Sequence, residues 1–209
     1  MARSTREAIL TATAELLRHK GYGALGVKDI VAASGAPIGS LYHHFPSGKV
    51  QIAGAALVNA GAAYAMLIPA VMDPHTDLGV ALRAVFDQAA EDMAGTGFTN
   101  MCPVASVAAE VAETVDELRD VTAGVFIGWL ADGTAYLVGR GLPEPTAREV
   151  AVALIGALEG AFVLARTLRS TEPLTVAGQV LGAPYRGVGL SPVTAAAGMS
   201  LHADVGASG

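Results

Sequence analysis

Two short helices joined by a tight turn are predicted within residues 24–49, and this stretch constrains the fold of the 209-residue chain more than any other. Its apolar residues recur at helical spacing, as Val27, Ile30, Val31, Leu41 and Phe45. Gly35 is suited to close one helix in the left-handed conformation, and Pro37 is suited to start the next. The stretch therefore predicts a helix-turn-helix, with helices at about 27–34 and 37–45.

The outer face of the second helix has the composition of a surface that reads DNA. No Asp or Glu occurs from residue 30 to residue 72. Small apolar groups and hydroxyls contact base edges in the major groove, whereas phenol, imidazole and ammonium groups contact phosphates. Two packed helices with polar residues facing solvent would give a similar pattern. The expected DNA-binding residues are Lys28, Pro37, Ile38, Gly39, Ser40, Tyr42, His43, His44 and Lys49.

The order and spacing of these residues resemble the N-terminal signature of the TetR family of transcriptional regulators. The resemblance rests on Asp29-Ile30, Ser34-Gly35-Ala36-Pro37 and Gly39-Ser40-Leu41-Tyr42-His43-His44-Phe45-Pro46-Ser47-Gly48-Lys49. It departs at Ile38, where many members carry Lys or Arg. Three further runs resemble the narrower branch typified by LmrA and YxaF: Ala24-Leu25-Gly26, Ser47-Gly48-Lys49 and Cys102-Pro103-Val104-Ala105. The resemblance implies a DNA-binding dimer released by a small molecule, and the branch suggests antibiotic- or flavonoid-like effectors.

Charge is distributed unevenly between the two parts of the chain. Residues 1–50 hold six Lys or Arg and three acidic residues, a net charge of +3. The remainder holds seven basic and sixteen acidic residues, a net charge of −9, which accounts for the overall −6. A small DNA-binding module attached to a domain that does not touch DNA is expected to show this asymmetry.

Helical patterns continue along the rest of the chain and predict an all-α protein. The fold expected is an N-terminal three-helix DNA-binding head followed by a C-terminal helical domain for ligand binding and dimerisation. Helices are expected at about 4–20, 47–68, 77–94, 103–113, 116–138 and 146–169, with Pro69 kinking or ending the second of these. The domains expected are the head at 1–46, the helical domain at 47–186 and a poorly ordered tail, rich in Gly, Pro, Ser and Ala, at 187–209.

Several site chemistries are not supported by the sequence. The run Gly21-Tyr22-Gly23-Ala24-Leu25-Gly26 matches G-x-G-x-x-G, but a helix precedes it and no acidic residue follows at the spacing of a dinucleotide site. His43 and His44 are adjacent and point about 100° apart on a helix, so they do not share a metal ion. Cys102 has no partner cysteine, and burial is its expected role. We therefore expect no enzyme, no cofactor and no metal.

The sequence also favours a cytoplasmic protein without a membrane span. One cysteine fits a reducing compartment, and the N-terminus lacks the apolar run of a signal peptide. Residues 150–165 are mostly apolar, but Glu159 interrupts them, and the run is shorter than a spanning helix requires.

The C-terminal domain is expected to carry an effector site and a dimer interface. The ligand-binding residues expected are Met66, Phe86, Met93, Phe98, Cys102, Phe126, Trp129 and Phe162, although most of them would serve any helical core. Dimerisation is expected through 116–138 and 146–169, with a seam of Leu154, Leu158, Gly160, Phe162 and Ala165. The seam residues could instead face the core of their own subunit.

These features are compatible with two functions. The first is a DNA-binding transcriptional regulator, a repressor that a small apolar or aromatic effector releases from a double-stranded operator. The alternative is a small all-helical ligand carrier or enzyme whose first fifty residues only resemble a DNA-binding head. The motif, the charge asymmetry and the lack of a catalytic constellation favour the regulator.

Overall fold

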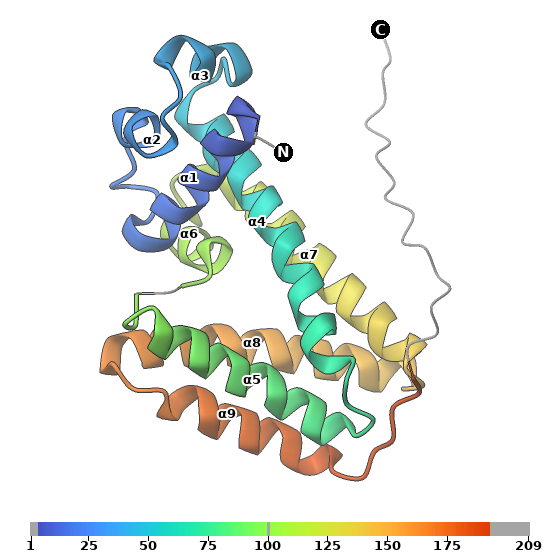
Figure 1. The fold of residues 1–209 in the computed structure, drawn as a ribbon. Helices are drawn as coiled ribbons and strands as arrows, with labels where there is room; N and C mark the ends of the chain where they lie inside the picture. Colours follow the sequence, from blue (N-terminus) through green and yellow to red (C-terminus); the bar gives the residue numbers. More distant parts are fainter. Residues whose placement is uncertain (1–3, 100, 193–209) are drawn as a thin grey trace, which may run out of the picture.

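The computed structural model describes residues 4–99 and 101–192, and within these ranges the chain is helical (Figure 1). The all-α prediction is confirmed. The described residues form nine α-helices and one 3-10 helix, without a β-strand. The α-helices are α1 (Thr5–Lys20), α2 (Val27–Ser34), α3 (Ile38–His44), α4 (Lys49–Met72), α5 (Leu78–Gly95), α6 (Pro103–Val111), α7 (Asp116–Gly139), α8 (Glu144–Leu168) and α9 (Glu172–Gly182), and the 3-10 helix is Ala183–Tyr185.

The head, α1 to α3, is shaped by signals close together in the sequence. Ser4 caps α1 in a reciprocal pair with Glu7: each side chain accepts the backbone N–H of the other residue. Gly21 ends α1 with a φ of 74°, and Gly35 ends α2 in the left-handed conformation with a φ of 68°. The turn between α2 and α3 is therefore tight, as the sequence predicts.

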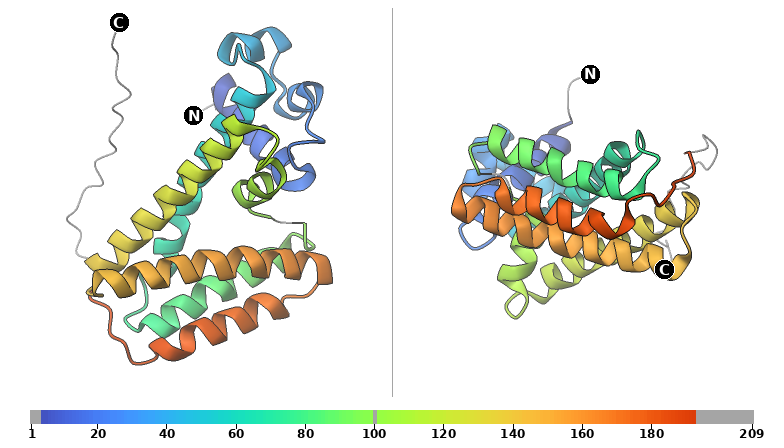
Figure 2. Two further views of the ribbon diagram at one scale, coloured as in Figure 1. Left: turned by 180° about the vertical axis from the view of Figure 1, so that it is seen from behind. Right: turned by 90° about the horizontal axis from the view of Figure 1, so that it is seen from below.

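Two long helices connect the head to the rest of the molecule. Figure 1 shows α4 and α7 running from the head toward a layer formed by α5, α8 and α9, and Figure 2 shows the same layer from behind and from below. The expectation that α4 stops near Ile68 is wrong, because Pro69 lies inside the helix, which continues to Met72. Pro69 has no N–H to donate to the Ala65 carbonyl, but the helical hydrogen bonding resumes beyond it, since Asp73 donates its N–H to the Pro69 carbonyl at 2.8 Å.

The C-terminal part of the chain is more ordered than its composition predicts. No helix was expected beyond residue 169, yet α9 packs along α5. The expected boundary of the tail at residue 187 is also wrong. Leu190 is buried, and its N–H donates to the Thr76 carbonyl at 2.7 Å. Residues 193–209 of the expected tail lie outside the described residues.

Two apolar cores hold the fold together. The first, which we call the head core, gathers α1–α3, the first half of α4, α6 and the start of α7. The second, the body core, gathers α5, α8 and α9 with the far ends of α4 and α7. The predicted boundary at residue 46 marks the end of the helix-turn-helix, but the head core extends beyond it because α6 inserts Val104, Val107 and Val111.

A buried arginine closes the far end of the body core. The Arg140 guanidinium is 2% exposed and donates to the Ser191 carbonyl at 2.5 Å, the Tyr136 hydroxyl at 2.6 Å and the His75 carbonyl at 2.6 Å. Asp73 lies 3.5 Å away and supplies the opposite charge. One side chain thus joins the end of α7 to the α4–α5 loop and to the residues after the 3-10 helix.

Three helices, α4, α7 and α8, are long and apolar enough to cross a membrane when judged by length and composition alone. The expectation that the apolar run of α8 is too short for a spanning helix is wrong by length and composition, because this 25-residue helix holds an 18-residue window with a mean hydropathy of 1.7. Each of the three helices buries part of its surface in a core and leaves apolar side chains exposed, among them Ile127 and Leu164. Apolar surface of this kind indicates a further contact surface.

Candidate DNA-binding site and effector domain

The short helix α3 separates a buried face from an exposed one. Leu41 and Phe45 lie in the head core, at 0% and 2% exposure. On the opposite side Ile38 is 53% exposed and Tyr42 is 47% exposed. Pro37, Gly39 and His43 are exposed as well, and Ser40 and His44 are half-buried. The predicted reading residues of α3 therefore share one accessible surface.

The turn before α3 is fixed by short hydrogen bonds. The Ser34 hydroxyl accepts the Ala36 N–H at 3.2 Å, and the Asp29 carboxylate accepts the Gly26 N–H at 3.1 Å at the start of α2. Asp29 also pairs with Lys20 at 3.5 Å. Because these contacts fix both ends of α2, they set the angle at which α3 projects from the head.

The two lysines predicted to contact DNA flank this surface. Lys28 is exposed on α2, and Lys49 is half-buried at the first turn of α4. The Lys49 ammonium lies 4.1 Å from the centroid of the Tyr22 ring, a cation–π contact that sequence reasoning missed. The cluster as a whole is an acid-free face with cations at its edges, which suits a phosphate backbone and the floor of a groove.

This arrangement defines a helix-turn-helix DNA-binding protein, and comparison with known proteins agrees. The model of the tetR family of bacterial regulatory proteins matches residues 9–56. The chain belongs to the TetR family of transcriptional regulators. Residues 79–180 match the C-terminal domain of LmrA/YxaF-like transcriptional regulators, so the narrower resemblance is confirmed as well.

Two curated relatives and one solved structure each share 89% or more of their own length with this chain. The regulator YxaF of Bacillus subtilis is 34% identical over 81% of this chain and 89% of its own length, and LmrA of the same organism is 30% identical over 81% and 90%. The crystal structure of a TetR regulatory protein from Rhodobacter sphaeroides superposes with a TM-score of 0.73 at 26% identity, covering 85% of this chain and 96% of that one. These relatives indicate a transcriptional regulator and not an enzyme.

The structure does not bring the eight predicted ligand-binding residues into one site. Phe86, Met93 and Phe162 lie in the body core, and Phe98 packs against it. Cys102 lies in the head core, where Phe126 and Trp129 pack against it. Met66 is 60% exposed. Even spacing of apolar residues along helices did not reveal that two separate cores would divide them.

The predicted dimer seam is wrong for three of its five residues. Leu154, Phe162 and Ala165 are buried in the body core of their own subunit, which is the alternative that the sequence left open. Leu158 is half-buried and packs against the same core, whereas Gly160 is exposed. A different face of α8 is exposed and apolar, and it consists of Val152, Ala153, Gly156, Gly160, Val163, Leu164 and Leu168.

A surface groove lies between α4 and α7. Its volume is about 410 Å³, and small residues form much of its lining. Trp129 stands in it with its indole N–H donating to the Gly61 carbonyl at 2.8 Å, and its ring packs edge-on against Tyr64. The lining residues are Val58, Gly61, Ala62, Ala65, Asp120, Val121, Gly124, Val125, Gly128, Trp129 and Asp132. Of the predicted ligand-binding residues, this groove contains Trp129.

A second, more polar groove lies on α5 near its start. Its volume is about 540 Å³. It contains none of the predicted ligand-binding residues, and charged side chains form half of its lining: His75, Asp77, Gly79, Val80, Arg83, Ala84, Asp87 and Arg186.

One buried carboxyl group was not expected from the sequence. Glu159 on α8 contacts the thiol of Cys102, and its Oε2 atom is buried without a hydrogen-bond partner in the described part of the chain. Burial raises the pKa of Glu159 to about 7, and it also raises the pKa of the Cys102 thiol, which fits an unreactive cysteine. The sequence signal for this group is a single acidic residue within the apolar run 150–165.

Proposed function

We propose that this TetR-family regulator is a repressor that binds a near-palindromic operator as a homodimer and leaves it when a small apolar or aromatic effector binds. The exposed, acid-free face of α3 carries this proposal. In it, Ile38, Ser40 and Pro37 read base edges in the major groove. Tyr42, His43, His44, Lys28 and Lys49 hold phosphates, and Gly39 allows close approach.

Substitutions in the head distinguish residues that contact base edges from residues that contact phosphates. Tyr42→Ala and Lys49→Ala should weaken binding to all duplexes, whereas Ile38→Ala or Ser40→Ala should change which bases are preferred. Fluorescence anisotropy with DNA from upstream of the gene and with an unrelated duplex measures both effects. Unchanged operator binding by both Tyr42→Ala and Lys49→Ala at moderate salt contradicts the phosphate assignments.

Dimerisation is proposed through the exposed apolar faces of α7 and α8. One three-helix head covers a half-site, so useful affinity and specificity need two heads related by two-fold symmetry. On α7, Ile127 is 67% exposed, and on α8 Gly160 has open space where a side chain would be. A second subunit would cover these faces and also explain the apolar surface of both helices without a membrane.

A charged side chain at the proposed interface tests the dimer. Gly160→Glu should give monomers in sedimentation velocity, because a carboxylate would be buried without a partner. Val180→Glu is the control, since Val180 is 68% exposed on α9, outside the proposed interface. Monomers from Val180→Glu but not from Gly160→Glu would move the interface to α9, and a monomeric parent chain at micromolar concentration would end the proposal.

The groove around Trp129 is the proposed effector site. Its volume lies within the range of small-molecule sites, roughly 300–1,000 Å³, and its lining is mostly apolar. It borders α4, whose first turn touches the head, so a ligand that separates α4 from α7 would change the spacing of the two heads. Such a ligand shifts the equilibrium only by the difference between its affinities for the two states.

Trp129 is the only tryptophan of the chain and reports on this site directly. Flavonoid- and antibiotic-like compounds should quench or shift its fluorescence in the same concentration range in which they release operator DNA. Gly128→Leu, which fills the groove, should abolish both responses. Compounds that bind tightly without changing operator affinity would remove the induction mechanism.

A cytoplasmic location is proposed from the same evidence. Its support is membership of a family of DNA-binding regulators, since the operator lies in the cytoplasm. Fractionation of cells that express the full chain tests it, and recovery with the membrane fraction would contradict it.

A further inference from the structure

The last residues of α1 and the start of its connection to α2, residues 18–23, are held by side chains from outside the three-helix head. We call this segment the α1–α2 turn. It includes Gly21-Tyr22-Gly23, the first half of the G-x-G-x-x-G run. Three helices, α4, α6 and α8, each send one charged side chain to it.

The strongest of these contacts comes from Glu110 on α6. Its carboxylate accepts the Tyr22 N–H at 2.7 Å and the Gly23 N–H at 2.5 Å, so both oxygens bind the same turn. A Cβ atom at Gly21 or Gly23 would lie 2.7 or 2.6 Å from these oxygens. The glycines therefore leave room for a carboxylate of the chain itself, and not for a nucleotide phosphate.

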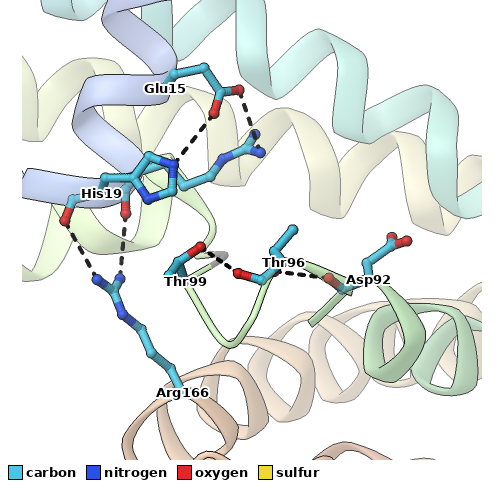
Figure 3. A network of polar contacts seen from close by, with 7 residues as sticks. Glu15, His19, Asp92, Thr96, Thr99 and Arg166 are labelled. Carbon is cyan, nitrogen blue, oxygen red and sulfur yellow. Dashed lines mark hydrogen bonds and ion pairs between the residues drawn. The ribbon is translucent and has the colours of Figure 1, made fainter. Parts of the chain in front are cut away.

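A positively charged group on α8 also contacts this segment. Arg166 points its guanidinium at the last carbonyls of α1, those of Arg18 at 3.4 Å and His19 at 3.5 Å (Figure 3). Carbonyls at a helix C-terminus carry partial negative charge, which a cation stabilises. These distances are longer than those of Glu110, so Arg166 holds the turn more weakly. The third side chain, Lys49 on α4, lies over the ring of Tyr22.

We propose that Glu110 and Arg166 are positioning residues that fix the orientation of the DNA-binding head relative to the effector domain. The carboxylate takes the N–H groups of the α1–α2 turn and the guanidinium takes its carbonyls, so the turn is restrained from both sides. Because Arg166 belongs to α8, whose inner face lies in the body core, a displacement of α8 reaches α1 without passing through α4. This inference rests on the proposed function in one respect: it assumes that the protein binds its operator through two heads.

Two readouts on the full chain test this role. The first is hydrogen exchange at the Tyr22 and Gly23 amides. The second compares affinity for a duplex that the parent chain selects from random sequences with affinity for the same duplex after one half-site has been scrambled. A head that is folded but poorly oriented binds the two-site duplex more weakly and still binds the duplex with one scrambled half-site. Only the two-site duplex requires both heads at a fixed spacing.

Variants at these two positions distinguish the effect of the lost charge from the effects of side-chain size and of folding. Glu110→Ala should speed exchange at both amides and lower two-site affinity about tenfold, the scale of one lost charged hydrogen bond, with single-site affinity unchanged. Glu110→Gln keeps the size and should lose less. Arg166→Met should have a smaller effect than Glu110→Ala, and Arg166→Lys should restore most of it. Glu113→Gln and Arg148→Met, exposed residues near the same elements, are the matched controls.

Three results would overturn the proposal. Unchanged exchange at Tyr22 and Gly23 in Glu110→Ala would mean that the carboxylate does not bind the turn. An equal loss of two-site and single-site affinity would mean that Glu110 only helps the head to fold. Equal losses from the controls would mean a general charge effect. If the parent chain itself does not distinguish two half-sites from one, the two-headed repressor fails instead, and hydrogen exchange alone decides whether Glu110 and Arg166 hold the turn.

Discussion

The helix ends of the head are fixed by contacts between residues close together in the sequence, whereas the far end of the body is held by contacts between distant residues. In the head, Ser4 and Glu7 cap each other across three residues, and Asp29 caps α2 from the same distance. In the body, Arg140 reaches the His75 carbonyl 65 residues away, and Asp77 accepts the Gly187 N–H over 110 residues. The two cores are therefore specified in different ways.

The difference explains where sequence reasoning succeeded. Caps, helix-ending glycines and apolar spacing lie within one or two turns of one another, so they can be recognised without knowing the fold. Contacts that cross the chain leave no local pattern. The helix α6 shows both effects. Its helical pattern is local, but its place in the head core is not, since it follows the body helix α5 in sequence and yet packs Val104, Val107 and Val111 into the head core.

The largest effect is expected where α5 and α9 cross. A Cβ atom at Gly182 would lie 2.5 Å from the Gly79 carbonyl oxygen, which belongs to rigid backbone. Gly182→Ala should therefore lower the free energy of unfolding by ~3 kcal/mol. Urea denaturation measures this, and Gly139→Ala is the control, because Gly139 also ends a helix but has open space beside it. Equal stability of the two variants would show that the crossing is not tight.

The buried carboxyl of Glu159 is expected to make stability depend on pH. Its pKa is raised to about 7 by burial, so the unfolded chain releases this proton at lower pH than the folded chain. Stability is thus lost as pH rises from the ordinary Glu pKa to about 7, and the penalty stays constant above that, at ~3 kcal/mol.

Glu159→Gln removes this titration. Relative to the parent chain, the variant should gain up to ~3 kcal/mol at about pH 8 and little at about pH 5. The Cys102 thiol contacts Glu159, and Tyr64 on α4 lies near it; both groups stay neutral over this range because their pKa values are raised. Denaturation at both pH values measures the difference, and an equal gain at each would rule out an isolated buried acid.

A matched pair of valines tests whether the two cores open separately. Val107 on α6 is 0% exposed in the head core, and Val85 on α5 is 5% exposed in the body core. Each Val→Ala change should cost ~2 kcal/mol through lost burial and a small cavity. In hydrogen exchange, Val107→Ala should expose α1 to α3, and Val85→Ala should expose α5 and α9. Opening of the same helices in both variants would mean that the cores act as one cooperative unit.

The sequence by itself determined the helical class, the helix-turn-helix, the ends of α1, α2 and α5, and the family. Local rules suffice for these, because Gly35 needs a positive φ, Asp77 needs only the nearby Val80 N–H, and the outer face of α3 follows from Leu41 and Phe45 pointing inward. Family membership then followed from the order of residues in one short stretch.

Only the tertiary structure decided how the remaining residues are used. No helix is predicted for 172–182, yet Gly178 and Gly182 allow α9 to approach α5 closely. Leu154, Phe162 and Ala165 have the spacing of an interface, and which face of α8 is covered by its own subunit depends on helices far away in the sequence. Helical periodicity predicts that a face is buried, but the partner that buries it is set by packing between distant elements.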